Sequence, residues 1–391
     1  MANVSSSNGL EKRPKLRFPG FDKPWKVFKA EELFQNITDK NHPDETVLTI
    51  IQGKGTLPRE QAGRNIHYDD ASLSNYKKVE QGDFIIHLRS FEGGLEMANE
   101  AGIVSPAYTI LRCKRPHSSL FYDAYFHTDE FINHNLSKSV EGIRDGRQIS
   151  YEAFKWLGIP YCEPTEQEKI SNLFAALNER IAKQRDLIEA LKKYKRGLLS
   201  AVFSQNVSMF STADFYAFSE LAVRRSEKYD PKCNAHAVCI ELEHIEQETG
   251  RIIGSTCADY QNSIKTVCKP GDVMFGKLRP YLRKYAFVQK ECVCSSEIWS
   301  LIPTDIVIPK YLFYLIQSEA FMKAANVSSG TKMPRAEWST IAKSGYPIPS
   351  KDDQQATVDI LETTDRIIVS HVASYDRLIE YKKGLLQRLF I

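Results

Sequence analysis

The sequence predicts an α+β protein in which two mixed α/β domains are separated by two long antiparallel coiled-coil helices, with a pseudo-twofold internal repeat. Two observations predict this architecture. Many residues match at a single offset of 187 positions, and two long segments carry apolar residues with helical periodicity. A repeat of roughly half the chain indicates two copies of one domain-plus-helix unit, whereas a short repeat would indicate a solenoid.

The repeat is clearest in segments 194–199 and 381–386, which both read Tyr-Lys-basic-Gly-Leu-Leu and lie 187 positions apart. At the same offset Gln167 aligns with Gln354. Ahead of the helices, segments 81–85 and 270–274 both contain a Gly-Asp turn that leads into an apolar strand. So many matches at one offset indicate a duplicated unit.

The first long helix is expected from about Thr165 to Phe203. Pro164 precedes it, and acidic residues occupy its first turn, as the helix dipole prefers. At 1.5 Å per residue such a helix is ~50 Å long, which is too long for one compact domain of ~150 residues.

The second long helix is expected to begin near Asp352 and to end near Phe390. Two helices with matching apolar stripes should pack against each other. The stripe is wider than a two-stranded seam needs, so it could also hold a partner helix; ordinary buried domain helices are the alternative. The positions predicted to form the helix pair or the partner interface are Leu173, Leu177, Ile181, Leu191, Tyr194, Leu198, Ile360, Ile367, Ile368, Leu378, Tyr381 and Leu385.

Domain boundaries follow from these helices. The expected segments are a flexible N-terminus at 1–14, a first domain at 15–163, a helix at 164–204, a second domain at 205–350 and a helix at 351–391. Strands are expected at 46–51, 84–88, 108–113, 238–242, 273–275, 286–288 and 298–302, and shorter helical stretches at 120–127 and 310–325.

Composition limits the possible functions. The 391 residues are 42% hydrophobic and 26% charged, and no run of 18 apolar residues occurs. The N-terminus lacks the apolar core of a signal peptide, so a cytoplasmic location is expected, and the eight cysteines fit reduced thiols. A net charge of +3 excludes a histone-like polycation but not a nucleic-acid binder with local basic clusters.

The most specific binding signal lies at 277–285, after a strand that is expected to end at Gly276. This segment has four cations with two tyrosines interleaved; arginine can form paired hydrogen bonds with guanine or bind phosphate, and tyrosine can pack on a sugar or base. A solvated hairpin is the alternative. The residues expected to contact DNA are Lys277, Arg279, Tyr281, Arg283, Lys284 and Lys332 in the second domain, and Lys54, Arg59, Arg64, Arg89, Arg144 and Arg147 in the first.

Signals for catalysis are weak. No P-loop and no nucleophile elbow occur. Segments 43–44 and 52–54 only faintly resemble a metal-dependent nuclease site, because Gln52 stands where a second acid should be. A zinc site lacks the paired CxxC spacing, and structural thiols are favoured over it; its possible ligands are Cys233, His236, Cys239 and Cys257.

The arrangement resembles the specificity (S) subunit of Type I restriction–modification systems over nearly the whole chain after residue 14. Asp353 departs from that family, because it stands where Glu is usual before Gln354. The segments that carry the resemblance are 16–21 with Trp25, 159–160 with 164–170 and 191–199, 271–284, and 348–349 with 352–390.

This resemblance implies a non-catalytic, sequence-specific DNA-binding subunit in which each domain is a target-recognition domain for one half of a bipartite site. It implies double-stranded DNA, two modification (adenine methyltransferase) subunits and restriction (helicase–nuclease) subunits as partners. S-adenosylmethionine, ATP and Mg would belong to those partners, with no cofactor or metal in this chain.

The rival interpretations are a self-contained metal-dependent nuclease or methyltransferase, and a coiled-coil scaffold without a DNA role. The sequence contains no Asn/Asp-Pro-Pro-aromatic methyltransferase motif, and a scaffold would not need the 277–285 cluster.

The long helices should act as a ruler between the two half-sites. Inserting one or two helical turns into either helix is expected to lengthen the unread DNA spacer and to leave the half-site sequences unchanged, since a DNA turn spans about 34 Å. Sequencing of methylated sites in such a mutant measures the spacer, and an unchanged spacing would refute the ruler.

Overall fold

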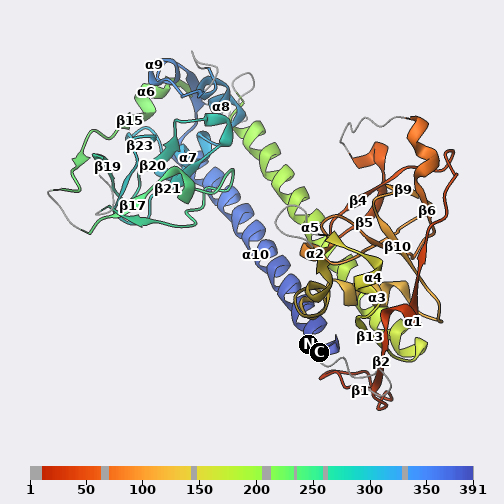
Figure 1. Ribbon diagram of the computed structural model, residues 1–391. Coiled ribbons are helices and arrows are strands. Elements are labelled where there is room, and N and C mark those ends of the chain that lie inside the picture. The colour runs from red at the N-terminus through yellow and green to blue at the C-terminus, as the bar shows by residue number, and fades with distance from the viewer. Residues whose placement is uncertain are drawn as a thin grey trace. The chain divides into compact units, whose positions relative to one another are not determined.

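The computed structural model describes residues 11–62, 70–141, 148–204, 213–232, 236–258, 263–327 and 333–390. It divides into two compact units: unit 1 contains residues 1–184 and 374–391, and unit 2 contains residues 185–373. The division falls inside both long helices, α5 (Pro164–Val202) and α10 (Lys351–Phe390), which are labelled in Figure 1. The domain boundaries predicted at the helix ends stay predictions.

Unit 1 combines short strands and short helices with part of each long helix. Its strands are β1 (Glu11–Lys12), β2 (Trp25–Lys29), β3 (Phe34–Ile37), β4 (Leu48–Ile51), β5 (Gly55–Pro58), β6 (Lys77–Val79), β7 (Phe84–Ile86), β8 (Glu96–Met97), β9 (Gly102–Val104), β10 (Thr109–Cys113), β11 (Val140–Glu141), β12 (Gln148–Ile149) and β13 (Gly158–Tyr161). Its shorter α-helices are α1 (Ala30–Leu33), α2 (Ser90–Gly93), α3 (Ser119–Phe126) and α4 (Tyr151–Phe154).

Unit 2 is built in the same way. Its strands are β14 (Asp214–Ala217), β15 (Ala222–Arg224), β16 (Lys228–Tyr229), β17 (Val238–Ile240), β18 (Thr256–Cys257), β19 (Lys265–Cys268), β20 (Val273–Gly276), β21 (Tyr285–Phe287), β22 (Cys292–Cys294), β23 (Ile298–Pro303) and β24 (Gly345–Ile348). Its shorter α-helices are α6 (Phe218–Leu221), α7 (Pro309–Leu315), α8 (Glu319–Ala325) and α9 (Trp338–Ile341).

Each unit contains the same four-stranded antiparallel sheet. The strand order is β3-β10-β7-β8 in unit 1 and β15-β23-β20-β21 in unit 2, so β10 and β23 have equivalent neighbours. The short helix α1 or α6 leads into the edge strand of each sheet. The predicted α+β fold, with its internal repeat and two long helices, is therefore confirmed.

A Gly-Asp turn with a buried aspartate precedes each of the equivalent strands β7 and β20. Asp83 accepts hydrogen bonds of 2.8 and 2.7 Å from the guanidinium of Arg112, and Asp272 accepts bonds of 2.6 and 2.7 Å from Arg225. Arg112 lies on β10, whereas Arg225 directly follows β15. A buried carboxylate needs such paired donors, so both units satisfy the same requirement with arginines from different strands.

A buried glutamine attaches each long helix to its own unit. The side-chain oxygen of Gln167 accepts the N–H of Ser118 at 3.0 Å, ahead of α3, and that of Gln354 accepts the N–H of Ile308 at 2.8 Å, ahead of α7. Each amide NH₂ group donates to a carbonyl just before its helix, that of Cys162 at 2.9 Å or of Pro349 at 3.0 Å. The two glutamines are 0% and 1% exposed and stand at the repeat offset.

The N-terminal segment of unit 1 completes the start of α5. The buried carboxylate of Glu166 accepts bonds of 2.9 and 2.7 Å from Arg17 and a bond of 2.9 Å from the indole N–H of Trp25. The N–H of Leu16 donates to the carbonyl of Arg388 on α10 at 2.9 Å. The motif at 16–21 with Trp25 thus connects the start of α5 to the end of α10.

The parts of α5 and α10 within each unit run antiparallel and share its core. In unit 1 the rings of Phe174 and Phe390 stack with centroids 6.3 Å apart, and Leu177 packs in the same cluster as Leu385. In unit 2 the Nζ atom of Lys195 lies 2.7 Å from a carboxylate oxygen of Asp365. Among the predicted helix-pair or partner positions, Leu173, Ile181, Leu191, Leu198, Ile368 and Leu378 are half-buried, whereas Tyr194, Ile360, Ile367 and Tyr381 are 43–60% exposed.

One predicted helical stretch differs in the structure. Segment 310–325 is interrupted at 316–318, which separates α7 from α8. The hydroxyl of Ser318 accepts the N–H of Phe321 and caps α8, so the chain starts a new helix at this point. Within the described part of the chain, no helix is both long and apolar enough to span a bilayer.

Removing either glutamine attachment should weaken its own unit. We expect Gln167→Ala and Gln354→Ala each to cost about 2 kcal/mol of unfolding free energy, because a buried backbone N–H loses its partner. Urea unfolding of the full chain measures this cost. Gln355→Ala, at an exposed neighbouring position, is the control and should change little. Equal effects of Gln354→Ala and Gln355→Ala would contradict the attachment.

Candidate nucleic-acid interface

The segment after β20 is held in place by its backbone. The N–H of Lys277 donates to the carbonyl of Glu297 at 2.9 Å, and the N–H of Arg279 donates to that of Pro334 at 2.8 Å. Arg279 adopts a left-handed conformation, with φ of 50°, just before the short 3₁₀ helix Pro280–Leu282. The segment therefore presents its side chains on a well-supported backbone.

Two of the predicted cations in this segment are occupied within the protein. The guanidinium of Arg283 pairs with Glu319 at 2.6 Å, and the ammonium of Lys284 donates to the carbonyl of Leu242 at 2.6 Å. Lys277, Arg279 and Tyr281 make no side-chain hydrogen bond or ion pair to any residue that the structure describes, and the side chain of Tyr281 is 54% exposed. These three side chains are available for a ligand.

Lys277 lines an open groove of about 680 Å³ in unit 2, which the sequence analysis did not identify. The groove lies along β15 and β23 and reaches α9. Its floor includes Ile298 and Ser300, and its other charged or aromatic lining residues are Arg224, Arg225, Lys228, Trp299 and Trp338.

An arginine stacked on two tryptophans forms one wall of this groove. The guanidinium carbon of Arg224 lies 5.0 Å from the ring centroid of Trp338 and 5.8 Å from that of Trp299. The two indole rings meet edge to face, with centroids 5.7 Å apart. Stacking of this kind holds a guanidinium by cation–π attraction and leaves its N–H edge free to bind an anion.

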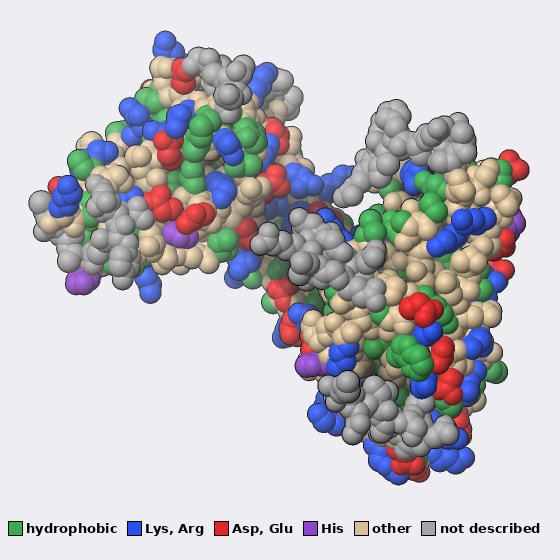
Figure 2. Space-filling model, viewed as in Figure 1, with side chains coloured by type: hydrophobic (Ala, Val, Ile, Leu, Met, Phe, Trp, Pro, Cys, Tyr) green, Lys and Arg blue, Asp and Glu red, His purple; other side chains and the backbone are tan. Residues whose placement is uncertain are grey.

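The groove has a positive charge that its own lining does not neutralise. It is lined by four cations and by no aspartate or glutamate, in contrast to the general surface, where acidic and basic side chains are interspersed (Figure 2). Asp272 lies behind Arg225 and neutralises it, which leaves Arg224, Lys228 and Lys277 to face a ligand. The cations at 224–228 are a sequence signal that could have indicated a binding site. Their proximity to Lys277 could not be predicted, because it depends on the fold.

The predicted DNA contacts of unit 1 lie on separate short elements. Lys54 is exposed at the tip of the β4–β5 hairpin, Arg59 is half-buried after β5, and Arg89 is exposed just after β7. Arg64, Arg144 and Arg147 of unit 1, and Lys332 of unit 2, lie outside the described residues.

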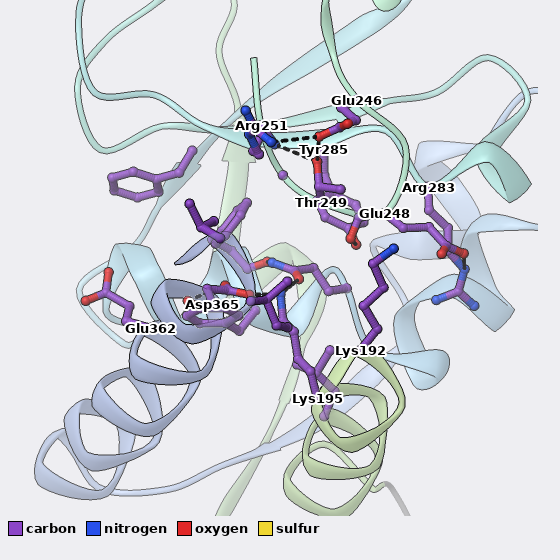
Figure 3. A pocket seen from close by; sticks show the side chains of 18 of the residues that line it. Lys192, Lys195, Glu246, Glu248, Thr249, Arg251, Arg283, Tyr285, Glu362 and Asp365 are labelled. Atoms are coloured by element: carbon purple, nitrogen blue, oxygen red, sulfur yellow. Dashed lines mark hydrogen bonds and ion pairs between the residues drawn. The ribbon is translucent and has the colours of Figure 1, made fainter. Parts of the chain in front are cut away.

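A second cavity of unit 2, of about 570 Å³, lies between α5, α10 and segment 246–251 (Figure 3). Its charges pair with one another: Lys195 with Asp365 at 2.7 Å, and Lys310 with Glu362 at 2.9 Å. Asp365 also accepts the hydroxyl of Tyr314 at 2.9 Å. Each of its four acidic lining residues lies within 4 Å of a lining cation, whereas the groove along β15 has no acidic lining residue, so the groove is the more suitable polyanion site.

The alternative zinc and nuclease sites find no support in the geometry. No group of three or more metal-ligating side chains occurs within the described ranges, and Cys233 lies outside them. The seven cysteines that the structure describes are free thiols. Asp44 is exposed, and the buried carboxylate nearest the tip at 52–54 is that of Glu96, which binds backbone N–H groups.

Comparisons of sequence and of structure both find similarity to specificity subunits of Type I restriction systems. Residues 227–378 match the family model "Type I restriction modification DNA specificity domain". The chain is 20% identical over 339 residues to the specificity subunit of the Type I restriction enzyme MjaVIII of Methanocaldococcus jannaschii, an alignment that covers 80% of this chain and 79% of that one.

Two solved structures share the fold. The S subunit of the Type I restriction–modification system of M. genitalium superposes with a TM-score of 0.53 at 14% identity, over 97% of this chain and 99% of that one. A chain from a study of complex assembly and conformational transition of the type I R-M system gives a TM-score of 0.59 at 15% identity, over 96% and 98%.

Separating the buried pair at the second cavity should destabilise unit 2. Asp365→Asn is expected to cost about 2 kcal/mol of unfolding free energy, because Lys195 stays buried without its carboxylate partner. Urea unfolding of the full chain measures the loss. Asp376→Asn, at an exposed position of α10, is the control. A loss no larger than that of the control would show that the pair does not support unit 2.

Proposed function

The chain belongs to the Type I restriction–modification DNA specificity subunits, and we propose that it reads a bipartite DNA target with one half-site bound by each unit. Members of this family are non-catalytic DNA-recognition subunits. Membership therefore favours this role over a self-contained nuclease or methyltransferase and over a scaffold without a DNA role.

The observation that carries the DNA contact is the groove along β15. Three cations that no acidic lining residue neutralises face a space that is also lined by two half-buried indoles, those of Trp299 and Trp338. Phosphates take half or more of the hydrogen bonds in protein–DNA interfaces, and Lys and Arg supply many of them. We assign phosphate positioning to Arg224, Lys228 and Lys277, and contact with the adjoining DNA to Arg279 and Tyr281.

In unit 1 we propose that the predicted cations Lys54, Arg59 and Arg89 contact the other half-site, together with Arg64, Arg144 and Arg147. Lys332 is proposed to assist in unit 2. Arg283 and Lys284 instead support the shape of the reading surface, because their side chains bind Glu319 and the carbonyl of Leu242.

Family membership also implies a complex with methyltransferase and restriction subunits. We propose that two modification subunits bind, one for each repeat, and that the exposed apolar residues of the long helices contact them. Tyr194 and Tyr381 stand at equivalent positions of the repeat and are 58% and 60% exposed, as a repeated docking position requires. S-adenosylmethionine, ATP and Mg would be bound by those partners, which act on DNA in the cytoplasm.

The helix lengths suit the proposed ruler. Helices α5 and α10 have 39 and 40 residues, or about 60 Å each at 1.5 Å per residue. Each helix contributes to the cores of both units, so a change in its length would change the distance between the two reading surfaces.

Removing a groove cation should weaken DNA binding in a salt-dependent way. Arg224→Ala, Lys277→Ala and Arg279→Ala are each expected to lower the affinity of the assembled modification complex about 5-fold, and to reduce the slope of log K against log salt by about 1. Gel shifts over a salt series measure both quantities.

Lys290→Ala is the matched control, because Lys290 is an exposed lysine of unit 2 outside the groove. If Arg224→Ala and Lys277→Ala left affinity and salt slope at the control values, the groove would not be the phosphate-binding surface.

A further inference from the structure

A buried carboxylate in unit 1 holds the tip of the β4–β5 hairpin. Glu96 is 0% exposed, and its two oxygens accept the N–H groups of Gly53 at 2.6 Å and Gly55 at 2.9 Å. Both glycines have positive φ angles, 73° and 78°, so they form the tight turn between the two strands. The carboxylate thus determines where the residue between them, Lys54, is placed.

The surrounding groups keep Glu96 charged. His127 lies with Nε2 3.4 Å from the carboxylate, and its Nδ1–H donates to the carbonyl of Asp123 at 2.8 Å. Burial alone would raise the pKa of Glu96, but His127 and the two glycine N–H groups outweigh burial and lower this pKa. Burying a charged carboxylate costs free energy, and here the hydrogen bonds of that carboxylate hold an exposed turn in place.

A second residue clamps the other side of the turn. The side-chain NH₂ of Asn99 donates to the carbonyls of Lys54 at 2.8 Å and Thr56 at 2.9 Å, and the N–H of Asn99 donates to the hydroxyl of Thr56 at 3.0 Å. The backbone of the tip is therefore bound internally. What it offers to a ligand is the side chain of Lys54, which makes no ion pair with any described residue, and that of Gln52.

The hairpin tip lies near the C-terminal end of β7. In unit 2 the equivalent strand is β20, and the residues proposed to contact DNA follow its C-terminal end. Gln52 packs against Gly93, the last residue of α2, and one turn of this helix separates Gly93 from the exposed Arg89. In unit 2 the residues after β20 are Lys277 and Arg279, which were assigned to DNA above. Lys54 and Arg89 therefore place their charges at the equivalent edge of unit 1.

The position of Glu96 carries no acid in unit 2. Glu96 pairs with Ile85, the second residue of β7, and the equivalent residue of β20, Met274, pairs with Ala286. The shared fold therefore does not require an acid at this position. Glu96 therefore has a local role in unit 1, which is to position the side chain of Lys54.

We propose that the hairpin tip at 52–54 is the half-site-specific DNA contact of unit 1, with Lys54 touching DNA and Glu96 acting as its positioning residue. This inference rests on the proposed function and deepens it. Lys54 donates to phosphate or to acceptors at base edges, and the rigid turn determines which step of the DNA it reaches.

The test uses the assembled modification complex and duplexes that carry its own target, identified by sequencing methylated DNA. For each variant, affinity is measured for the intact target and for two duplexes in which one half-site is scrambled. Lys54→Ala should reduce discrimination about 5-fold against scrambling of one half-site only. This half-site should be the one whose discrimination Arg279→Ala, in unit 2, leaves unchanged. Lys26→Ala, an exposed lysine of β2, is the control.

A double-mutant cycle separates positioning from a merely structural role. Glu96→Gln should reduce the same discrimination in the natural chain and should add nothing in the Lys54→Ala background. Additive losses, or unchanged discrimination with Lys54→Ala, would overturn the inference. If the natural complex does not discriminate against scrambling of either half-site, the proposed function itself fails.

Discussion

The rest of the structure depends on the buried glutamine at the start of each long helix. The amide of Gln167 or Gln354 joins the first turn of its helix to the loop ahead of α3 or α7 and to the strand end that precedes the helix. Each amide is buried and bonded at both ends, so helix and sheet cannot separate without losing these bonds. In each unit the first turn of the long helix is thereby held to the rest of the unit.

On this shared scaffold the two units have diverged at their exposed edges. The strand position of Arg224 corresponds to Asn36, since these two residues lie opposite Leu301 and Leu111 in equivalent sheets. Trp338 begins α9, whereas Tyr151 begins α4 and donates its hydroxyl to the carbonyl of Phe34. Unit 2 has a stacked arginine and a cationic groove, and unit 1 has a hairpin tip held by an acid. The proposed DNA contacts of the two units therefore differ, as recognition of an asymmetric bipartite target would require.

The sequence predicted the features that depend on local pattern or on repetition. The period of Leu177 and its neighbours predicted α5, and the offset between Gln167 and Gln354 predicted the duplicated unit. It did not predict the groove, because Arg224, Trp299 and Trp338 come from distant segments, which the pairing of β15 with β23 and the packing of α9 bring together. The prediction that Arg283 and Lys284 contact DNA stays a prediction. The sequence did not show that their side chains bind Glu319 and the carbonyl of Leu242, because these partners are remote in the chain. The sequence predicted one helical stretch over 310–325 and not the break before α8, because the apolar periodicity of this segment continues across Ser318.

The central claim is that each unit reads its own half-site independently on a common frame. It is tested most directly by sequencing methylated sites in cells that express the system with a chain carrying both Arg279→Ala and Tyr281→Ala, the two residues of unit 2 assigned to DNA contact beyond the phosphates. We expect one half of the bipartite motif to lose sequence preference while the other half and the spacer stay unchanged. Loss of preference in both halves, or in neither, would contradict the account.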